Sequence, residues 1–337
     1  MMTRFLFNII LLVASIGTSI AQQTFPLSIT VALDGSGNYK SIQEAVNSVR
    51  DLGQQRVKIF IKKGIYKEKL FIPSWKTNIS LIGESSESTI ITGNDYSGKP
   101  VPNGKDILAL EKYSTYTSYT VLVQANDVVL ENLTIENTAG RVGQAVALHV
   151  EGDRIVVKNC RILGNQDTLY TATEDSRQYY QNCEIAGTTD FIFGEATCVF
   201  QSCTIRSLTN SFITASAQRQ SQTFGYVFFD CKLIAEPEAK KVYLGRPWRS
   251  YAKTVFIKTD MGSHITPEGW HPWPGDKMFP NKEKTAFYAE YQSRGEGAAP
   301  DKRVKWSKQL SSRDAKKYTL RNIFSKTEIW LPEIASQ

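Results

Sequence analysis

The chain has 337 residues, with 40 lysines and arginines against 33 aspartates and glutamates, and a formal net charge of +7. This length suffices to bury a large core in one elongated domain or two ordinary ones. The basic excess suggests an acidic partner. Ordinary solubility explains it equally well, because the cations are spread along the chain without a long basic run.

The N-terminus has the pattern of a secretory signal peptide. Arg4 precedes an apolar run over residues 5–20, and a small-residue cleavage site ends at Ala21. A transmembrane anchor is the alternative, but the run is short and no later segment is apolar enough to span a bilayer. We therefore expect residues 1–21 to be removed and residues 22–337 to form one exported domain, periplasmic or secreted. Neither a membrane nor a nucleic acid is expected as a partner.

One helix and many short strands are predicted in the first part of this domain. Residues 29–33 form a candidate strand, and the helix after it can be capped by Ser41, with Glu44 completing a capping box. Apolar residues then recur at helical spacing, at Ile42, Ala45, Val46 and Val49. Further strands are predicted at residues 57–61, 69–72, 79–82 and 89–91. This order favours a β-solenoid whose open end is covered by the helix.

A repeated frame runs through the middle of the chain. It reads V-V-K-N-C-R-I, Y-Y-Q-N-C-E-I, V-F-Q-S-C-T-I and V-F-F-D-C-K-L, around Cys160, Cys183, Cys203 and Cys231, and an earlier copy has Leu133 in place of cysteine. Irregular spacing of this kind is typical of a solenoid, with the cysteines stacked inside it. Core packing explains them better than a metal site, because they form no C-x-x-C pair. The odd total of five leaves a free thiol, and a Cys183–Cys203 bridge is an option.

Two acidic residues occupy matched positions in successive repeats. Asp167 and Asp190 each follow a brief apolar strand opened by Cys and Ile, and aromatic residues follow both, among them Tyr170 and Phe193. If equivalent residues stack at the strand spacing of about 4.8 Å, the two carboxylates become near neighbours. Such a pair on a rigid sheet is a candidate acid and nucleophile.

The second half of the chain adds two aromatic motifs and a polar C-terminal segment. Arg246 and Trp248 lie two apart, which in a strand directs both side chains to one face. The arginine could hold a carboxylate ionised and the tryptophan could face a sugar ring, although a surface ion pair and a core indole fit equally well. Residues 269–274 are rich in aromatics and prolines and predict an ordered loop. Residues 311–324 predict a partly helical cover.

Together these motifs resemble the pectin methylesterases, a family of carbohydrate esterases. The motifs stand in family order over nearly the whole mature chain: G-I-Y-K-E, Q-A-V-A-L, G-N-Q-D-T-L-Y, D-F-I-F-G and L-G-R-P-W. The resemblance implies a right-handed single-stranded parallel β-helix with a short N-terminal capping helix and a partly helical C-terminal cover. It also implies a monomer without cofactor or metal that releases methanol from methyl-esterified homogalacturonan (pectin). Residues 287–291 and 303–307 are more similar to bacterial members than to plant ones, so we expect a bacterial enzyme.

The resemblance assigns a role to each candidate residue. Asp190 matches the nucleophile and Asp167 matches the general acid. The interaction between the two carboxyl groups would raise the pKa of Asp167, while Arg246 keeps Asp190 charged. The remaining assignments are oxyanion amides at Gln144 and Gln166, and a substrate groove of Trp248, Tyr170, Phe193 and Thr115. Two positions depart from the family pattern, Glu195 and His149, and we expect His149 to be structural.

Other functions fit the same solenoid. A lyase would be expected to need calcium and a basic catalytic residue, and a polygalacturonase would cleave the backbone. A non-catalytic polysaccharide-binding solenoid is the third alternative. The presence of both aspartates, both glutamines and Arg246 argues against it, because binding alone does not require an acid, a nucleophile and an oxyanion site in register.

Overall fold

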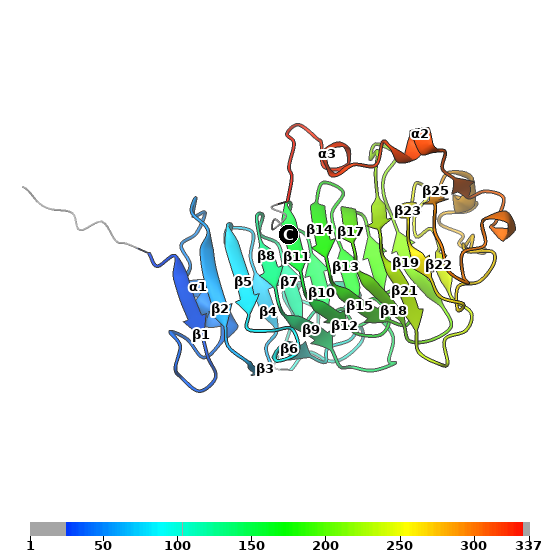
Figure 1. Cartoon of the computed structure of the whole chain (residues 1–337). Helices are drawn as coiled ribbons and strands as arrows, with labels where there is room; N and C mark the ends of the chain where they lie inside the picture. The colour runs from blue at the N-terminus through cyan, green and yellow to red at the C-terminus, as the bar shows by residue number, and fades with distance from the viewer. Residues whose placement is uncertain (1–24, 103, 333–337) are drawn as a thin grey trace, which may run out of the picture.

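The computed structural model describes residues 25–102 and 104–332, so the predicted signal peptide lies outside the described residues. The chain coils into a parallel β-helix in which successive strands are added to three sheets in turn (Figure 1). Every pairing between these strands is parallel, and Leu133 and the four cysteines of the repeated frame precede strands that pair in register. The predicted fold class is confirmed. No helix within the described residues is long and apolar enough to cross a bilayer.

The three sheets are distinguished by length. Sheet 1 has eleven strands: β1 (Ser28–Val31), β2 (Val57–Ile61), β5 (Ile79–Gly83), β8 (Val129–Glu131), β11 (Ile155–Lys158), β14 (Arg177–Gln181), β17 (Thr197–Gln201), β20 (Tyr226–Phe229), β23 (Lys253–Ile257), β25 (Phe287–Tyr291) and β26 (Lys308–Gln309). Sheet 2 has seven: β4 (Leu70–Ile72), β7 (Val121–Val123), β10 (Leu148–Val150), β13 (Leu169–Thr171), β16 (Ile192–Gly194), β19 (Phe212–Ser216) and β22 (Tyr243–Gly245). Sheet 3 has eight: β3 (Gly64–Tyr66), β6 (Thr89–Gly93), β9 (Thr134–Asn137), β12 (Arg161–Leu163), β15 (Glu184–Gly187), β18 (Thr204–Ser207), β21 (Lys232–Ala235) and β24 (Asp260–Met261).

Helix α1 (Ile42–Ser48) lies at the first coils, where the sequence predicts it (Figure 1). Ser41 is its N-cap and accepts a hydrogen bond from the Glu44 backbone N–H at 3.3 Å. The carboxylate of Glu68 accepts from the N–H groups of Ile42 and Gln43 at 3.0 Å each. A carboxylate at this position also complements the positive end of the helix dipole. Glu68, distant in sequence, therefore supplies the acidic cap that was expected from Glu44.

The repeated cysteine frame has a conformational cause. The residue before each stacked cysteine is in the left-handed region, with φ of 53° at Asn159, 52° at Asn182, 55° at Ser202 and 51° at Asp230. Asparagine and aspartate tolerate this conformation better than other residues with a side chain, because their short polar side chains bond locally. The chain turns there from sheet 1 into sheet 3, and the next residue points inward. All five cysteines are buried free thiols, so the Cys183–Cys203 option is wrong.

Stacked aromatic rings fill the interior behind sheet 1. The in-register residues Tyr180, Phe200, Phe228 and Phe256 stack with centroid separations of 4.8, 4.4 and 4.3 Å. Each such pair adds about 0.5–1.5 kcal/mol beyond the area it buries. This ladder runs through the coils that carry Asp190 and Arg246.

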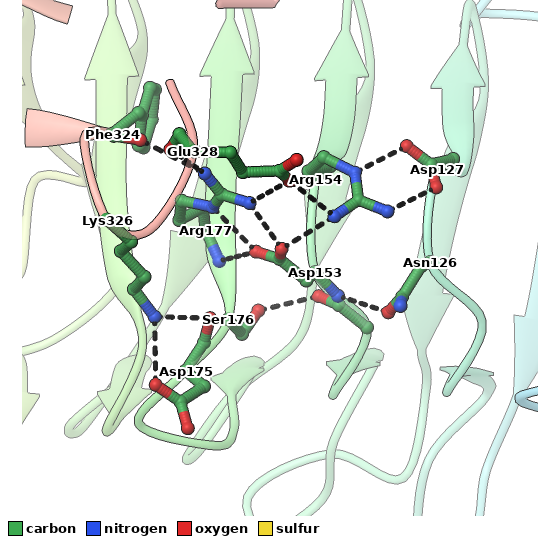
Figure 2. Close-up of polar contacts among 11 residues, drawn as sticks. Asn126, Asp127, Asp153, Arg154, Asp175, Ser176, Arg177, Phe324, Lys326 and Glu328 are labelled. Carbon is green, nitrogen blue, oxygen red and sulfur yellow. Dashed lines mark hydrogen bonds and ion pairs between the residues drawn. The ribbon is translucent and has the colours of Figure 1, made fainter. Parts of the chain in front are cut away.

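The C-terminal segment covers the outer face of sheet 1, as predicted. It contains the 3₁₀ turn at Pro300–Lys302, α2 (Ser312–Ala315) and α3 (Leu320–Ile323), and it runs back along the coil (Figure 1). Phe324 packs on outward apolar residues of the sheet, including Tyr179. Buried Arg177 pairs with Asp153 at 2.6 Å and with Glu328 at 3.1 Å, and it donates to the Phe324 carbonyl (Figure 2). This network holds the segment against the coils.

Candidate active site

The two candidate aspartates occupy equivalent turns at the start of neighbouring strands of sheet 2. Leu169 pairs with Ile192 between β13 and β16, so Asp167 and Asp190 stand at equivalent positions one coil apart. Both have left-handed backbones, with φ of 64° and 48°. Such conformations cost of order 1–3 kcal/mol and tend to occur at functional sites. The backbone therefore shows the equivalence of Asp167 and Asp190 that the sequence repeat predicts.

A cavity of about 260 Å³ gathers most of the candidate residues. Its lining consists of Thr115, Tyr116, Gln144, Gln166, Asp167, Asp190, Phe193, Ala215, Arg246, Trp248 and Trp273. Of the nine candidates, only Tyr170 is outside this lining. It lies beside the cavity, where its ring stacks on that of Phe193 at 4.5 Å.

The surroundings of the two carboxyl groups differ. Arg246 donates to Asp190 through both Nη2–H and Nε–H, at 2.6 and 3.0 Å. Burial raises the pKa of Asp190, and the hydrogen bond and charge of Arg246 act against that rise. Burial and the negative charge of Asp190 together raise the pKa of Asp167 well above its ordinary value. The site therefore favours a protonated Asp167 beside an ionised Asp190.

Aromatic rings and a close backbone contact hold Arg246 in place. Its guanidinium carbon lies 4.0 Å from the centroid of the Phe212 ring and 3.6 Å from that of Trp273. Gly245, just before it, allows β22 to approach β19, because a Cβ there would lie 2.0 Å from the Thr214 hydroxyl. The L-G-R-P-W motif thus needs Gly245 for the close packing of β22 on β19 and Arg246 for the ion pair with Asp190.

Gln144 and Gln166 form a parallel bridge between adjoining coils. Both line the same cavity as the carboxyl groups. Side-chain amides placed in this way can donate hydrogen bonds to an oxygen that becomes negative during a reaction.

The sequence interpretation missed Tyr116 and Trp273 as parts of the site. Tyr116 belongs to the 3₁₀ turn Thr115–Thr117, in the run of threonine, serine and tyrosine that made the assignment of Thr115 ambiguous. Trp273 belongs to the aromatic loop that the sequence predicts only as ordered. Nothing in either segment indicates the side of the coil on which it packs, so no sequence signal was available.

The two departures from the family pattern lie next to the site. His149 is buried, its Nε2 is 3.2 Å from Glu151, and its ring lies 4.5 Å from that of Tyr170. It is outside the cavity lining, consistent with a structural residue. Glu195 borders a second cavity, together with Arg219 and Arg249, and burial raises the pKa of Glu195.

Within the described residues, no group of three or more histidine, cysteine, aspartate and glutamate side chains is arranged to hold a metal ion. The polar side chains of the lining include two carboxyls, two amides, one guanidinium and the hydroxyls of Thr115 and Tyr116. With an ionised and a protonated carboxyl side by side, this set can carry out nucleophilic attack and proton transfer.

The chain belongs to the pectinesterase family of carboxylic ester hydrolases, whose sequence model matches residues 28–327. It is 39% identical over 318 residues to a pectinesterase of Petunia integrifolia, covering 90% of this chain and 80% of that protein. It spans only about half the length of several pectinesterase/pectinesterase inhibitor proteins of Arabidopsis thaliana, for example 45% of one that is 38% identical.

Solved structures show the same fold. Pectin methylesterase from carrot superposes with a TM-score of 0.79 at 35% identity, covering 90% of this chain and 94% of that chain. A pectin methylesterase in complex with a hexasaccharide gives 0.78 at 29% identity, covering 93% and 100%. The relatives from petunia and carrot are plant proteins. The similarity of residues 287–291 and 303–307 to bacterial members therefore stays a prediction.

Proposed function

We propose that this chain is an exported pectin methylesterase that hydrolyses the methyl esters of galacturonate in pectin and releases methanol. The family membership and the similarity to a saccharide-bound pectin methylesterase support this activity. The observation that carries the mechanism is the pair of unlike carboxyl groups, Arg246-bound Asp190 beside buried Asp167, in one cavity with two amides.

In the proposed mechanism, a carboxylate oxygen of Asp190 attacks the ester carbonyl carbon. The side-chain amides of Gln144 and Gln166 donate hydrogen bonds to the resulting oxyanion, and each donor of this kind is typically worth about 3–4 kcal/mol in the transition state. Asp167 gives its proton to the methoxy oxygen as the carbon–oxygen bond breaks. Methanol leaves, and Asp190 is joined to the sugar carboxyl group as an anhydride.

The second half of the reaction restores the enzyme. A water molecule attacks the sugar carbonyl carbon of the anhydride, and Asp167, now a carboxylate, accepts its proton. The bond to Asp190 breaks, which frees its carboxylate for the next cycle. The raised pKa of Asp167 supports this role, because the group must be protonated when methanol leaves and must be able to recover a proton from water.

The groove for the sugar chain would be lined by Trp248, Phe193 and Thr115, and by Tyr116 beside them. The ring of Tyr170 stacks on that of Phe193. Methyl-esterified homogalacturonan is the proposed partner, and the basic net charge suits a polymer with acidic residues. Export through the predicted signal peptide and action as a monomer without a cofactor belong to the same proposal.

The experiment is methanol release from highly methylated pectin, with solution viscosity followed in parallel. Asp190→Asn should abolish release, and Asp230→Asn is the matched control, since Asp230 is an exposed aspartate with the same left-handed backbone. Methanol released at constant viscosity supports the esterase. A fall in viscosity would show a lyase or polygalacturonase, and no reaction at all would show a binding solenoid.

A further inference from the structure

A buried lysine lies under the wall of the proposed active site. Lys282 opens the 3₁₀ turn Lys282–Lys284, and its side chain is fully buried. Lysine is almost never buried unless it is paired, and here Asp276 lies 2.7 Å from its Nζ. Replacing a buried ion pair by apolar residues is often neutral or stabilising, so stability alone does not account for this one.

The indole of Trp273 connects this ion pair to the catalytic one. The Nζ of Lys282 lies 4.3 Å from the centroid of the Trp273 ring, and the guanidinium carbon of Arg246 lies 3.6 Å from it. Arg246 in turn binds Asp190 at 2.6 Å. One aromatic ring of the cavity wall thus contacts two cations, and each cation has its own carboxylate. Both contacts are attractive, because the face of an indole is electron-rich.

Lys282 is one of the residues that hold the loop carrying Trp273, and it does so through Asp276. Asp276 accepts hydrogen bonds from the N–H groups of Met278 and Phe279 at 3.0 and 3.1 Å, which orients its carboxylate toward Lys282. The backbone carbonyl of Lys282 accepts hydrogen bonds from the N–H groups of Thr285 and Ala286, which directly precede β25. Lys282 therefore joins the tip of the loop to the body of the coil and places Trp273 against Arg246.

We propose that Lys282 is a positioning residue for the esterase: it holds Trp273 against Arg246, which binds Asp190, and it places a second positive charge behind that pair. This inference rests on the proposed function. The charged and titratable groups around Asp190 are Arg246, Lys282, Asp167 and Tyr288. Those around Lys282 are Asp276, Arg246 and Arg249, and the imidazole of His271 lies within the field of Arg246. Burial raises the pKa of Asp190, and the charge of Lys282 acts with that of Arg246 to lower it.

The test uses two variants and a control in the full-length protein. Lys282→Met removes the charge and keeps much of the side-chain length. The double variant Lys282→Gln with Asp276→Asn replaces the ion pair by a neutral amide pair, so no carboxylate is left without its cation. Lys284→Gln removes one positive charge from an exposed position in the same turn and is the matched control.

Without the charge of Lys282 the pKa of Asp190 rises, so the acid limb of the profile of kcat/KM against pH moves to higher pH. We expect kcat/KM on methylated pectin to fall about tenfold at pH 5 and by a smaller factor at pH 8, mainly through kcat, because Lys282 is buried below the wall. Lys284→Gln should leave the profile in place. Both variants should keep a cooperative melting transition.

A purely structural role predicts a lower melting temperature with an unchanged pH profile and kcat, and that result in the folded double variant would overturn the proposal. If Lys282→Met does not fold, the double variant alone decides it. Failure of the proposed function itself would be seen separately, as absence of methanol release by the unmodified protein.

Discussion

The replacement Arg246→Lys tests whether the geometry of the ion pair at Asp190, and not only its charge, supports the reaction. The guanidinium donates two hydrogen bonds, at 2.6 and 3.0 Å, and packs against the rings of Phe212 and Trp273 at 4.0 and 3.6 Å. Lysine keeps the positive charge, but it has a single ammonium group and no flat surface. It can therefore replace one hydrogen bond and not the stacking.

The expected loss follows from these contacts. A hydrogen bond to a charged group is worth about 1.5–3 kcal/mol, so losing one should lower kcat/KM roughly ten- to hundredfold. The weaker pairing also lets burial raise the pKa of Asp190 further. Because Asp190 must be ionised to attack, the acid limb of the pH profile should move to higher pH.

The assay is initial-rate methanol release from methylated pectin between pH 4 and pH 9. Arg206→Lys is the control, since Arg206 forms a partly exposed ion pair with Glu184 on sheet 3, away from the site. Activity of Arg246→Lys within threefold of the unmodified protein, with an unmoved acid limb, would refute the argument that the two hydrogen bonds and the stacking matter.

Two further predictions concern the general acid and the C-terminal segment. In the unmodified protein, activity should be lost as pH rises through the raised pKa of Asp167, which gives an alkaline limb in the pH profile. Asp167→Asn should lower kcat about 10²–10⁴-fold and remove this limb. An alkaline limb that persists in the residual activity of the variant would contradict the assignment. Arg177→Met should destabilise the fold by about 3 kcal/mol, the lower end for a broken buried pair, because Arg154 still pairs with Asp153 and Glu328. Thermal melting measures this, with kcat unchanged below the transition, and an unchanged melting temperature would contradict it.

Much of the fold could be predicted because each coil repeats a local rule. The residue before each stacked cysteine adopts a left-handed backbone, and the next one points inward, so N-C, S-C and D-C mark the corners. The same spacing places Asp167 and Asp190 one coil apart in register. In a parallel solenoid, position along the repeat converts directly into position in space.

The prediction was poorer wherever a contact joins a coil to a segment without periodicity. Strand β3 was not predicted, because three residues in a turn-rich stretch give no alternating pattern. Glu68 caps helix α1 across 26 residues of sequence. The free state of Cys183 and Cys203 depends on the relative orientation of their side chains in the column, and sequence spacing does not determine that.

The sequence by itself determined the coil, the neighbouring aspartates and the presence of Arg246 and Trp248 two residues apart, because repeat register and strand alternation are local properties. Residue spacing alone does not say which aspartate Arg246 binds; the family resemblance pointed to Asp190, and the tertiary structure places the guanidinium 2.6 Å from that carboxylate. It also brought Trp273 onto that arginine and Lys282 onto the ring of Trp273. These loop residues follow no period, and their positions come from the packing of aromatic rings and the pairing of buried charges, which act between segments distant in the chain.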